Sequence, residues 1–226
     1  MNGNTIQPAQ NPQPVFQVRD PVSALTHFLA FLAAIFATPP LLIHAAEQSA
    51  PRLHLISLSI FMVSMIGLYG ASSAYHTFRL SEQGNRFLKK LDHTMIFYLI
   101  AGSYTPVCIV ALGSSGNRLL GLVWALALAG TVFKLCWVTC PKWLSSVIYI
   151  AMGWSCITAM PAIVGALDRA GFLWLLSGGI AYTAGGMIYA VKPRRLTGRM
   201  FGIHEIFHIF VMLGSLCHYV FMYGFL

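Results

Sequence analysis

Two histidines near the end of the chain have the spacing of a metal site. His204 and His208 lie in the stretch RMFGIHEIFHIF, where the last apolar segment begins. Four residues turn an α-helix by about 400°, so the two imidazoles project from one face with Cα atoms about 6 Å apart. At this spacing both side chains can bind one metal ion. The alternative is a pair of interfacial histidines that hydrogen-bond to neighbouring helices.

The composition of the chain limits where further ligands can lie. Of the 226 residues, 57% are hydrophobic and 9% are charged. A soluble domain carries roughly 25% charged residues, so this chain has too little polar surface to cover itself in water. The net charge of +8 comes from short basic runs between apolar segments, which is typical of membrane orientation signals rather than of a nucleic-acid interface. We therefore expect a multi-pass protein of the cell (plasma or inner) membrane that binds no nucleic acid.

Apolar runs long enough to cross a bilayer alternate with short polar breaks from Pro21 onward. A spanning helix needs about 20 residues, because each residue adds about 1.5 Å across about 30 Å of hydrocarbon. The sequence predicts a disordered cytoplasmic tail over residues 1–20 and a transmembrane domain over residues 21–226. That domain is expected to be an all-α bundle of seven membrane-spanning helices, at Val22–Ala46, Leu53–Phe78, Leu91–Leu112, Leu119–Val138, Trp143–Leu167, Phe172–Val191 and Phe201–Phe225.

The basic residues predict the orientation of this bundle. Eleven Lys and Arg residues lie on the side that holds the N-terminus, against three on the other side. Cytoplasmic loops carry the excess of positive charge, so we predict a cytoplasmic N-terminus and a C-terminus outside. Lys134, at the end of the fourth span, is counted on the cytoplasmic side because its long side chain can snorkel there.

Four ionisable residues inside the spans are predicted to share one layer. His76 ends the second span, Asp92 begins the third, and His204 and His208 begin the seventh. Alternate spans cross in opposite directions, so all three ends lie on the cytoplasmic side. We predict that His76, His204 and His208 bind one zinc ion. Three neutral imidazoles leave a fourth tetrahedral position open, which is typical of a catalytic zinc.

Two further residues of this layer are candidates for catalysis. Asp92 can orient a zinc-bound water and take its proton, and Ser72, one turn before His76, can hydrogen-bond the water or a substrate carbonyl. This is the equipment for hydrolysing an amide or ester. The structural alternatives are that Asp92 stabilises the start of its helix or pairs with Lys89 or Lys90, and that Ser72 is a small packing residue.

The remaining polar residues are predicted to be structural, with the alternative for His93 and His27 that they support a metal ligand. His93 and Glu205 point about 100° away from the residues that precede them, and Glu205 is expected to serve the start of its helix. His218 lies about 15 Å deeper than His208, too far to share the metal, and is expected to pack. His27 lies near the same rim but has no motif support. Small packing roles are also predicted for the cysteines, Cys108, Cys136, Cys140, Cys156 and Cys217.

Several segments together resemble a known family. SSAYHTF, LDHTMIFYLIAGSYTP, GLVWALALAGTVFK, MGW and HEIFHIFVMLGSLCHYV, in this order and spacing, resemble the bacterial hemolysin III family from Asp20 to the C-terminus. That family belongs with the progestin and adipoQ receptors, including the adiponectin receptors, in a wider group that contains alkaline ceramidases. The resemblance implies a seven-helix bundle with zinc held by His76, His204 and His208. It also implies that Asp92 orients the zinc-bound water or acts at the metal, and that Ser72 belongs to the same signature.

The residues and the resemblance together favour a zinc-dependent integral membrane hydrolase. The expected substrate is a lipid amide or ester, as in the ceramidases, that enters from the cytoplasmic leaflet. One alternative is a non-enzymatic sensor or receptor for membrane homeostasis, with a structural metal. The other is a channel or haemolysin, with His218 and a third span kinked at Pro106 lining a pore. A secreted toxin fits poorly, because seven apolar spans allow no soluble form.

Overall fold

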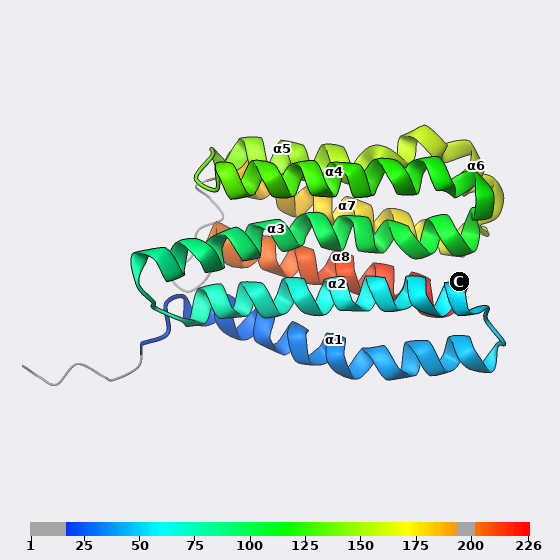
Figure 1. The fold of residues 1–226 in the computed structure, drawn as a ribbon, viewed down its shortest axis with the longest axis horizontal. Coiled ribbons are helices and arrows are strands. Elements are labelled where there is room, and N and C mark those ends of the chain that lie inside the picture. Colours follow the sequence, from blue (N-terminus) through cyan, green and yellow to red (C-terminus); the bar gives the residue numbers. More distant parts are fainter. Residues whose placement is uncertain (1–16, 194–201) are drawn as a thin grey trace, which may run out of the picture.

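The computed structural model describes residues 17–193 and 202–226, and these residues form helices and short connections without any strand (Figure 1). Seven helical segments are long and apolar enough to cross a membrane. The predicted all-α, seven-span architecture is therefore confirmed. Residues 1–16 of the predicted tail, and Phe201 at the start of the seventh predicted span, lie outside the described residues, and the division of the chain at residue 20 stays a prediction.

The helices follow the order expected from the hydropathy of the chain. The long ones are α1 (Pro21–Glu47), α2 (Arg52–Thr77), α3 (Glu82–Pro106), α4 (Asn117–Cys136), α7 (Arg169–Val191) and α8 (Ile203–Phe225). Two shorter helices, α5 (Lys142–Gly153) and α6 (Met160–Ala166), together make the fifth span.

The long helices pack as a closed ring. From α1 to α5, each helix contacts the next one in sequence (Figure 1). Helix α5 then packs on α7, α7 packs on α8, and α8 packs on α1, which closes the ring. Large buried side chains fill the spaces between neighbours, among them Phe61, Tyr69, Phe97 and Phe221. Closure brings the C-terminal end of α2 beside the N-terminal end of α8, although these ends are far apart in sequence.

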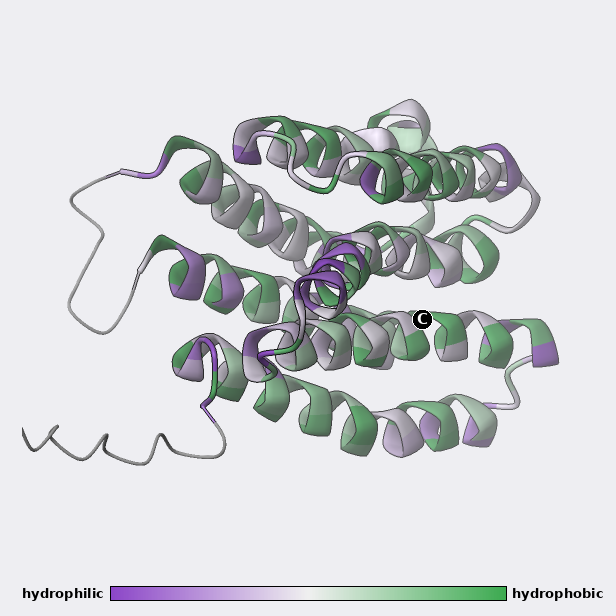
Figure 2. Cartoon of the chain, turned by 60° about the vertical axis from the view of Figure 1, so that its left-hand side comes forward, coloured by the Kyte–Doolittle hydropathy of each residue, from purple (hydrophilic) through white to green (hydrophobic). Residues whose placement is uncertain are grey.

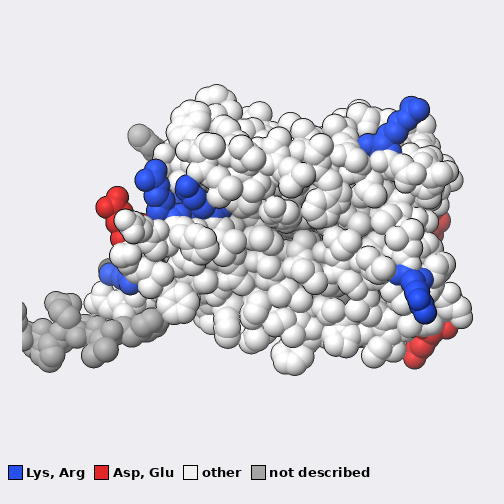
Figure 3. All heavy atoms as spheres, in the orientation of Figure 1, with Lys and Arg blue, Asp and Glu red and all other residues white. Residues whose placement is uncertain are grey.

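The outer surface of the ring is apolar. Large hydrophobic side chains are strongly exposed there, including Phe36, Val63 and Val191, as expected for a surface that faces lipid. Figure 2 shows hydrophobic residues along the helices and hydrophilic ones mainly towards their ends. On the face drawn in Figure 3, the Lys, Arg, Asp and Glu residues lie at the two ends and leave an uncharged band between them.

The third span begins earlier than predicted. Helix α3 starts at Glu82, nine residues before the predicted Leu91, because Ser81 caps it by accepting a hydrogen bond from the Gly84 N–H at 3.3 Å. Most of the predicted polar break is therefore helix that extends beyond the apolar part. At the other end, the α-helix stops at Pro106 and continues as a π-helical turn over Val107–Ala111.

The fifth span is not one continuous helix, as predicted over Trp143–Leu167. A 3₁₀ segment, Trp154–Ala159, separates α5 from α6, and α6 restarts with Pro161 in its first turn, a position where the missing N–H costs nothing. The Tyr104 hydroxyl donates to the Gly153 carbonyl at 2.6 Å and accepts from the Cys156 N–H at 2.8 Å. A side chain of α3 thus satisfies backbone groups that the break leaves open.

Lys134 does not snorkel to the rim, and that prediction was wrong. Its side chain is 1% exposed, and its Nζ donates to Ser145 Oγ at 2.6 Å and to Cys140 Sγ at 3.1 Å. The connection between α4 and α5 folds back over the end of α4, so the ammonium group meets polar atoms inside the protein instead of water.

Candidate metal centre

Three histidines meet where the end of α2 lies beside the start of α8. His76 is in the last turn of α2, and His204 and His208 are in the first two turns of α8. One ring nitrogen from each lies within 4.8 Å of the others, and the Nε2 atoms of His76 and His204 are 2.9 Å apart. The sequence-based prediction of this histidine triad therefore agrees with the geometry.

The three imidazoles are a donor set that could hold a metal ion such as zinc. Zinc binds imidazole nitrogen at about 2.0–2.1 Å, which places ligand nitrogens roughly 3.3 Å apart. The Nδ1 atoms of His204 and His208 are buried and have no partner among the described residues. In His204 the nitrogen that faces His76 is Nε2, so this is the atom available to a shared ion, and Nδ1 lies on the opposite side of the ring.

Asp20 holds His76 in a defined orientation. Its Oδ2 lies 2.9 Å from His76 Nδ1, and its backbone N–H donates to the His76 carbonyl at 2.9 Å. Because an ionised carboxylate only accepts, His76 Nδ1 carries the proton and Nε2 presents its lone pair towards His204 and His208. A carboxylate behind a histidine is the usual support of a metal ligand.

Sequence reasoning missed Asp20 because the prediction placed it in the tail. The signal was nevertheless present. Asp20 directly precedes the first span, which starts at the same predicted rim as the other candidates. Its depth in the membrane therefore matches the depth of His76, His204 and His208.

Glu205 fixes the start of α8. Its Oε2 accepts from the Gly202 N–H at 2.8 Å, and its Oε1 accepts from Ser23 Oγ, in α1, at 2.7 Å. The first contact caps the helix and the second ties it to α1. The role predicted for Glu205 at the helix start thus agrees with the structure, and these contacts hold His204 in place.

His27 belongs to the same cluster. Its ring stacks on that of His208, with centroids 3.5 Å apart and planes at 11°, and the edge of Tyr69 packs against it at 5.0 Å. Both ring nitrogens of His27 are buried without a partner among the described residues. This histidine lacked motif support in the sequence, and its nearness to His208 depends on the packing of α1 against α8.

Asp92 and Ser72 lie on the wall of one cavity with the histidines. Ser72 is 2% exposed on α2, and Asp92 is half-buried on α3. Among the described residues, neither belongs to the group of atoms close enough to share a metal. The geometry therefore separates three candidate ligands from two candidate helpers, whose catalytic roles stay predictions.

The two other histidines of the cavity make structural contacts. His93 Nδ1 donates to the Lys89 carbonyl at 2.9 Å, and His218 Nε2 donates to the Leu175 carbonyl at 3.3 Å. Both contacts fit the packing roles predicted for them.

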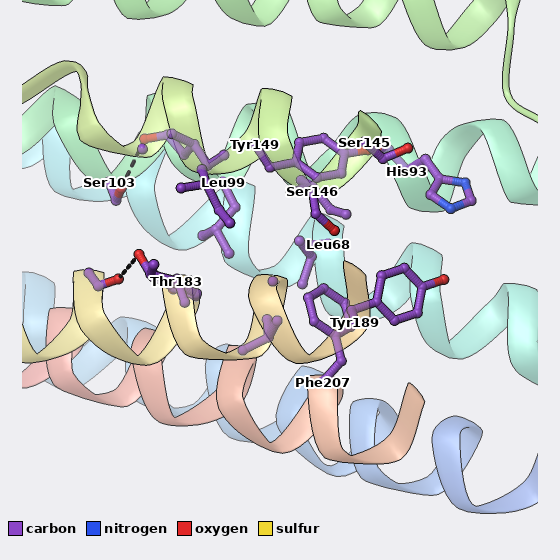
Figure 4. Close-up of a pocket in the computed structure, with 18 of the residues that line it drawn as sticks. Leu68, His93, Leu99, Ser103, Ser145, Ser146, Tyr149, Thr183, Tyr189 and Phe207 are labelled. Carbon is purple, nitrogen blue, oxygen red and sulfur yellow. Dashed lines mark hydrogen bonds between the residues drawn. The ribbon is translucent and has the colours of Figure 1, made fainter. Parts of the chain in front are cut away.

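The cavity has a volume of about 500 Å³ and reaches from the histidine cluster to His218. Most of its wall is apolar, with Leu68, Leu99, Val107 and Ile163 among the lining residues. Figure 4 shows Tyr149 of α5 facing Tyr189 of α7 across the space, with Thr183 further along the same helix. The size of this cavity and its mostly apolar wall are typical of sites that bind small molecules.

Comparisons with known proteins agree with this arrangement. The chain is 36% identical over 203 residues to the hemolysin-3 homolog of Bacillus subtilis (strain 168), covering 89% of this chain and 92% of the relative. It is 33% identical over 194 residues to hemolysin-3 of Bacillus cereus, covering 85% of each. The adiponectin receptor protein of Drosophila melanogaster is 26% identical over 184 residues, 73% of this chain and 41% of the relative. The model of the family described as "Haemolysin-III related" matches residues 16–219, and the chain therefore belongs to this family of multi-pass membrane proteins.

Proposed function

We propose that the protein is a zinc-dependent hydrolase that cleaves a lipid amide or ester within the membrane. The observation that carries this proposal is the position of the histidine triad. Three imidazole nitrogens within 4.8 Å of one another lie on the wall of a mostly apolar cavity of about 500 Å³. A metal-binding group beside a lipid-sized space favours chemistry on a lipid.

The chain's own residues would divide the work as follows. His76, His204 and His208 hold the metal, and Asp20 keeps His76 in the tautomer that presents Nε2. A bound zinc supplies a Lewis acid that polarises a carbonyl and activates water. His27 and Glu205 keep the His208 and His204 rings in place.

Asp92 and Ser72 are proposed to serve the reaction itself. The Asp92 carboxylate is available on the cavity wall to accept a proton from the attacking water. The Ser72 hydroxyl lies one helical turn before His76 and can donate to the substrate carbonyl oxygen. The apolar part of the cavity holds the acyl chain and excludes bulk water from the reacting group.

The names of the relatives specify no reaction. Two are called hemolysin-3 or its homolog and one an adiponectin receptor, so the proposal depends on the geometry of the site. With the N-terminus in the cytoplasm, as the basic residues predict, the triad lies at the cytoplasmic rim and the lipid enters from that leaflet.

The test combines metal content with lipid turnover in detergent-purified protein. We expect about one zinc per chain by elemental mass spectrometry, lost in His204→Ala and His208→Ala, and hydrolysis of fluorescent ceramides or fluorescent glycerolipid esters that is lost with it. Asp92→Asn should keep the zinc and lose turnover by about 100-fold or more. Asp168→Asn, a change at the N-cap of α7, is the matched control and should alter neither.

Two outcomes would overturn the proposal. Turnover that survives loss of the metal would exclude zinc chemistry. The non-enzymatic sensor would be favoured if two results came together. The wild type would turn over no lipid, and the Asp92→Asn variant would keep both the metal and an unchanged membrane-homeostasis phenotype.

A further inference from the structure

A second polar cluster adjoins the cavity, formed by residues from α4, α5 and the loop between them. Its centre is the buried ammonium of Lys134, which donates to Ser145 Oγ at 2.6 Å and to Cys140 Sγ at 3.1 Å and lies 5.7 and 5.8 Å from the ring centroids of Phe133 and Tyr149. In the described part of the chain, no carboxylate lies within 4.0 Å of it. An ionised group inside a membrane protein is costly unless it is paired, so this one calls for an anion.

Further cations gather at the same end of the cavity. Lys89 and Lys142 line the wall, and the charged groups with which Lys89 interacts most strongly include Lys142, Arg19 and Lys134. Asp92 is the carboxylate on this part of the wall. The other two carboxylates that line the cavity, Asp20 and Glu205, already accept hydrogen bonds from His76 and from Ser23 and Gly202. Against Lys89, Lys142 and the adjoining Lys134, Asp92 alone leaves an excess of positive charge at this end, which attracts an anionic ligand.

This cationic end adjoins the metal centre. Lys142 Nζ lies 4.5 Å from the centroid of the Tyr189 ring, and that ring lies 5.6 Å from the ring of His204. A molecule that contacts Lys142 can therefore also reach the histidines, with one aromatic ring between the two groups.

Two serines add hydroxyl groups at this end. Ser145 and Ser146, both buried in the first turn of α5, line the cavity. Ser145 is held by Lys134, whereas Ser146, 4% exposed, forms no hydrogen bond with any described residue. Figure 4 shows Ser146 on the cavity side of α5, above the space that separates this helix from α7. Because this hydroxyl is open to the cavity rather than fully buried, it is free to donate to a polar group of a ligand.

We propose that this end of the cavity binds a phosphate group, and that the ligand is an anionic phospholipid whose chain occupies the apolar remainder. Ammonium and hydroxyl donors suit phosphate oxygens, which only accept when ionised. The positive-inside rule explains why Lys89 and Lys142 lie on this side, but it explains neither the burial of Lys134 nor the unpaired Ser146. The assignment names the substrate class of the proposed hydrolase, and it rests on that function only in taking this cavity to be where the lipid binds.

The experiment measures binding without turnover. Full-length protein in detergent, with EDTA present so that no metal can bind the phosphate, is titrated by microscale thermophoresis with dioctanoyl phosphatidic acid. Dioctanoylglycerol, which has the same chains without the phosphate, and inorganic phosphate are the two comparison ligands. The variants are Lys89→Gln/Lys142→Gln and Ser146→Ala. The matched control is Lys90→Gln, because Lys90 is next to Lys89 but does not line the cavity.

Wild type should bind dioctanoyl phosphatidic acid at least tenfold more tightly than dioctanoylglycerol. The double lysine variant should lose about tenfold or more, Ser146→Ala about threefold, and Lys90→Gln nothing. Equal affinity for the two lipids, or an equal loss in Lys90→Gln, would overturn the phosphate subsite. Inorganic phosphate that binds as tightly as the lipid, with the same dependence on Lys89 and Lys142, would support the subsite with free phosphate as its source. Because no metal or turnover is involved, these outcomes are independent of the hydrolase test.

Discussion

Asp20 and His76 contact each other twice, through Asp20 Oδ2 and His76 Nδ1 at 2.9 Å and through the Asp20 N–H and the His76 carbonyl at 2.9 Å. The residue before the first membrane helix thus supports a candidate metal ligand at the end of the second. This pairing joins the start of α1 to the candidate metal centre, so the geometry of the centre depends on a residue that precedes the first span.

The first prediction concerns this support. Asp20→Asn should weaken zinc binding by about 10- to 100-fold, because an amide is a weaker acceptor and also offers an N–H that allows the other His76 tautomer. Competition with a chromophoric chelator measures the affinity. Glu47→Gln, at the far end of α1, is the control, and an Asp20→Asn variant with wild-type affinity would contradict the role.

A second prediction tests the deep end of the cavity. A Cβ atom at Gly178 would overlap with the His218 ring at Cδ2, whereas one at the adjacent Gly179 would meet nothing within 4 Å. Gly178→Ala should therefore displace His218 and lower the free energy of unfolding by about 1–3 kcal/mol. Gly179→Ala should leave it unchanged. Thermal unfolding of both variants in detergent decides the matter, and equal midpoints would show that His218 moves without cost.

Lys134 gives a third prediction, about stability. Lys134→Met removes a buried charge and keeps much of the side-chain volume, while Ser145 Oγ and Cys140 Sγ, 3.2 Å apart, can still bond each other. The variant should be as stable as wild type or more stable by about 1 kcal/mol, although it should bind phosphatidic acid less tightly. A clear fall in the melting temperature would mean that the ammonium stabilises the fold without a ligand.

The orientation of the bundle yields a fourth prediction. With the N-terminus in the cytoplasm and seven spans, the C-terminus lies outside. Alkaline phosphatase fused after Leu226 should be active in a bacterial host, and green fluorescent protein at the same position should be dark. The reverse pattern would place the histidine triad at the outer rim.

The closeness of the three histidines could be predicted from the sequence because it follows from helix geometry and from the alternating direction of the spans. His204 and His208 share a face by their spacing, and His76 reaches their depth because even-numbered spans end on the side where odd-numbered spans begin. Hydropathy over about 20 residues is a strong signal, so the spans themselves were equally accessible.

The contacts that the sequence did not predict all depend on packing between distant segments. The place of Asp20 at the predicted rim gives its depth, but nothing in the sequence near Asp20 indicates that its partner is His76, 56 residues away. The stacking of His27 on His208 depends on the angle between α1 and α8. The burial of Lys134 depends on how the connection to α5 folds, and the break in the fifth span has Tyr104 of α3 as its partner. Local patterns do not contain such relationships.

Tyr104 has a mechanical consequence for this fold. Its hydroxyl is the partner of both the Gly153 carbonyl and the Cys156 N–H at the break between α5 and α6. If α3 slid away from the break, both backbone groups would lose this partner at the wall of a mostly apolar cavity, at a cost of several kcal/mol. The break between α5 and α6, which would otherwise act as a hinge, is therefore fixed to α3. Because α3, α5 and α6 are held together at this point, a change in the width of the cavity is left to the other helices that line it, chiefly α2, α7 and α8.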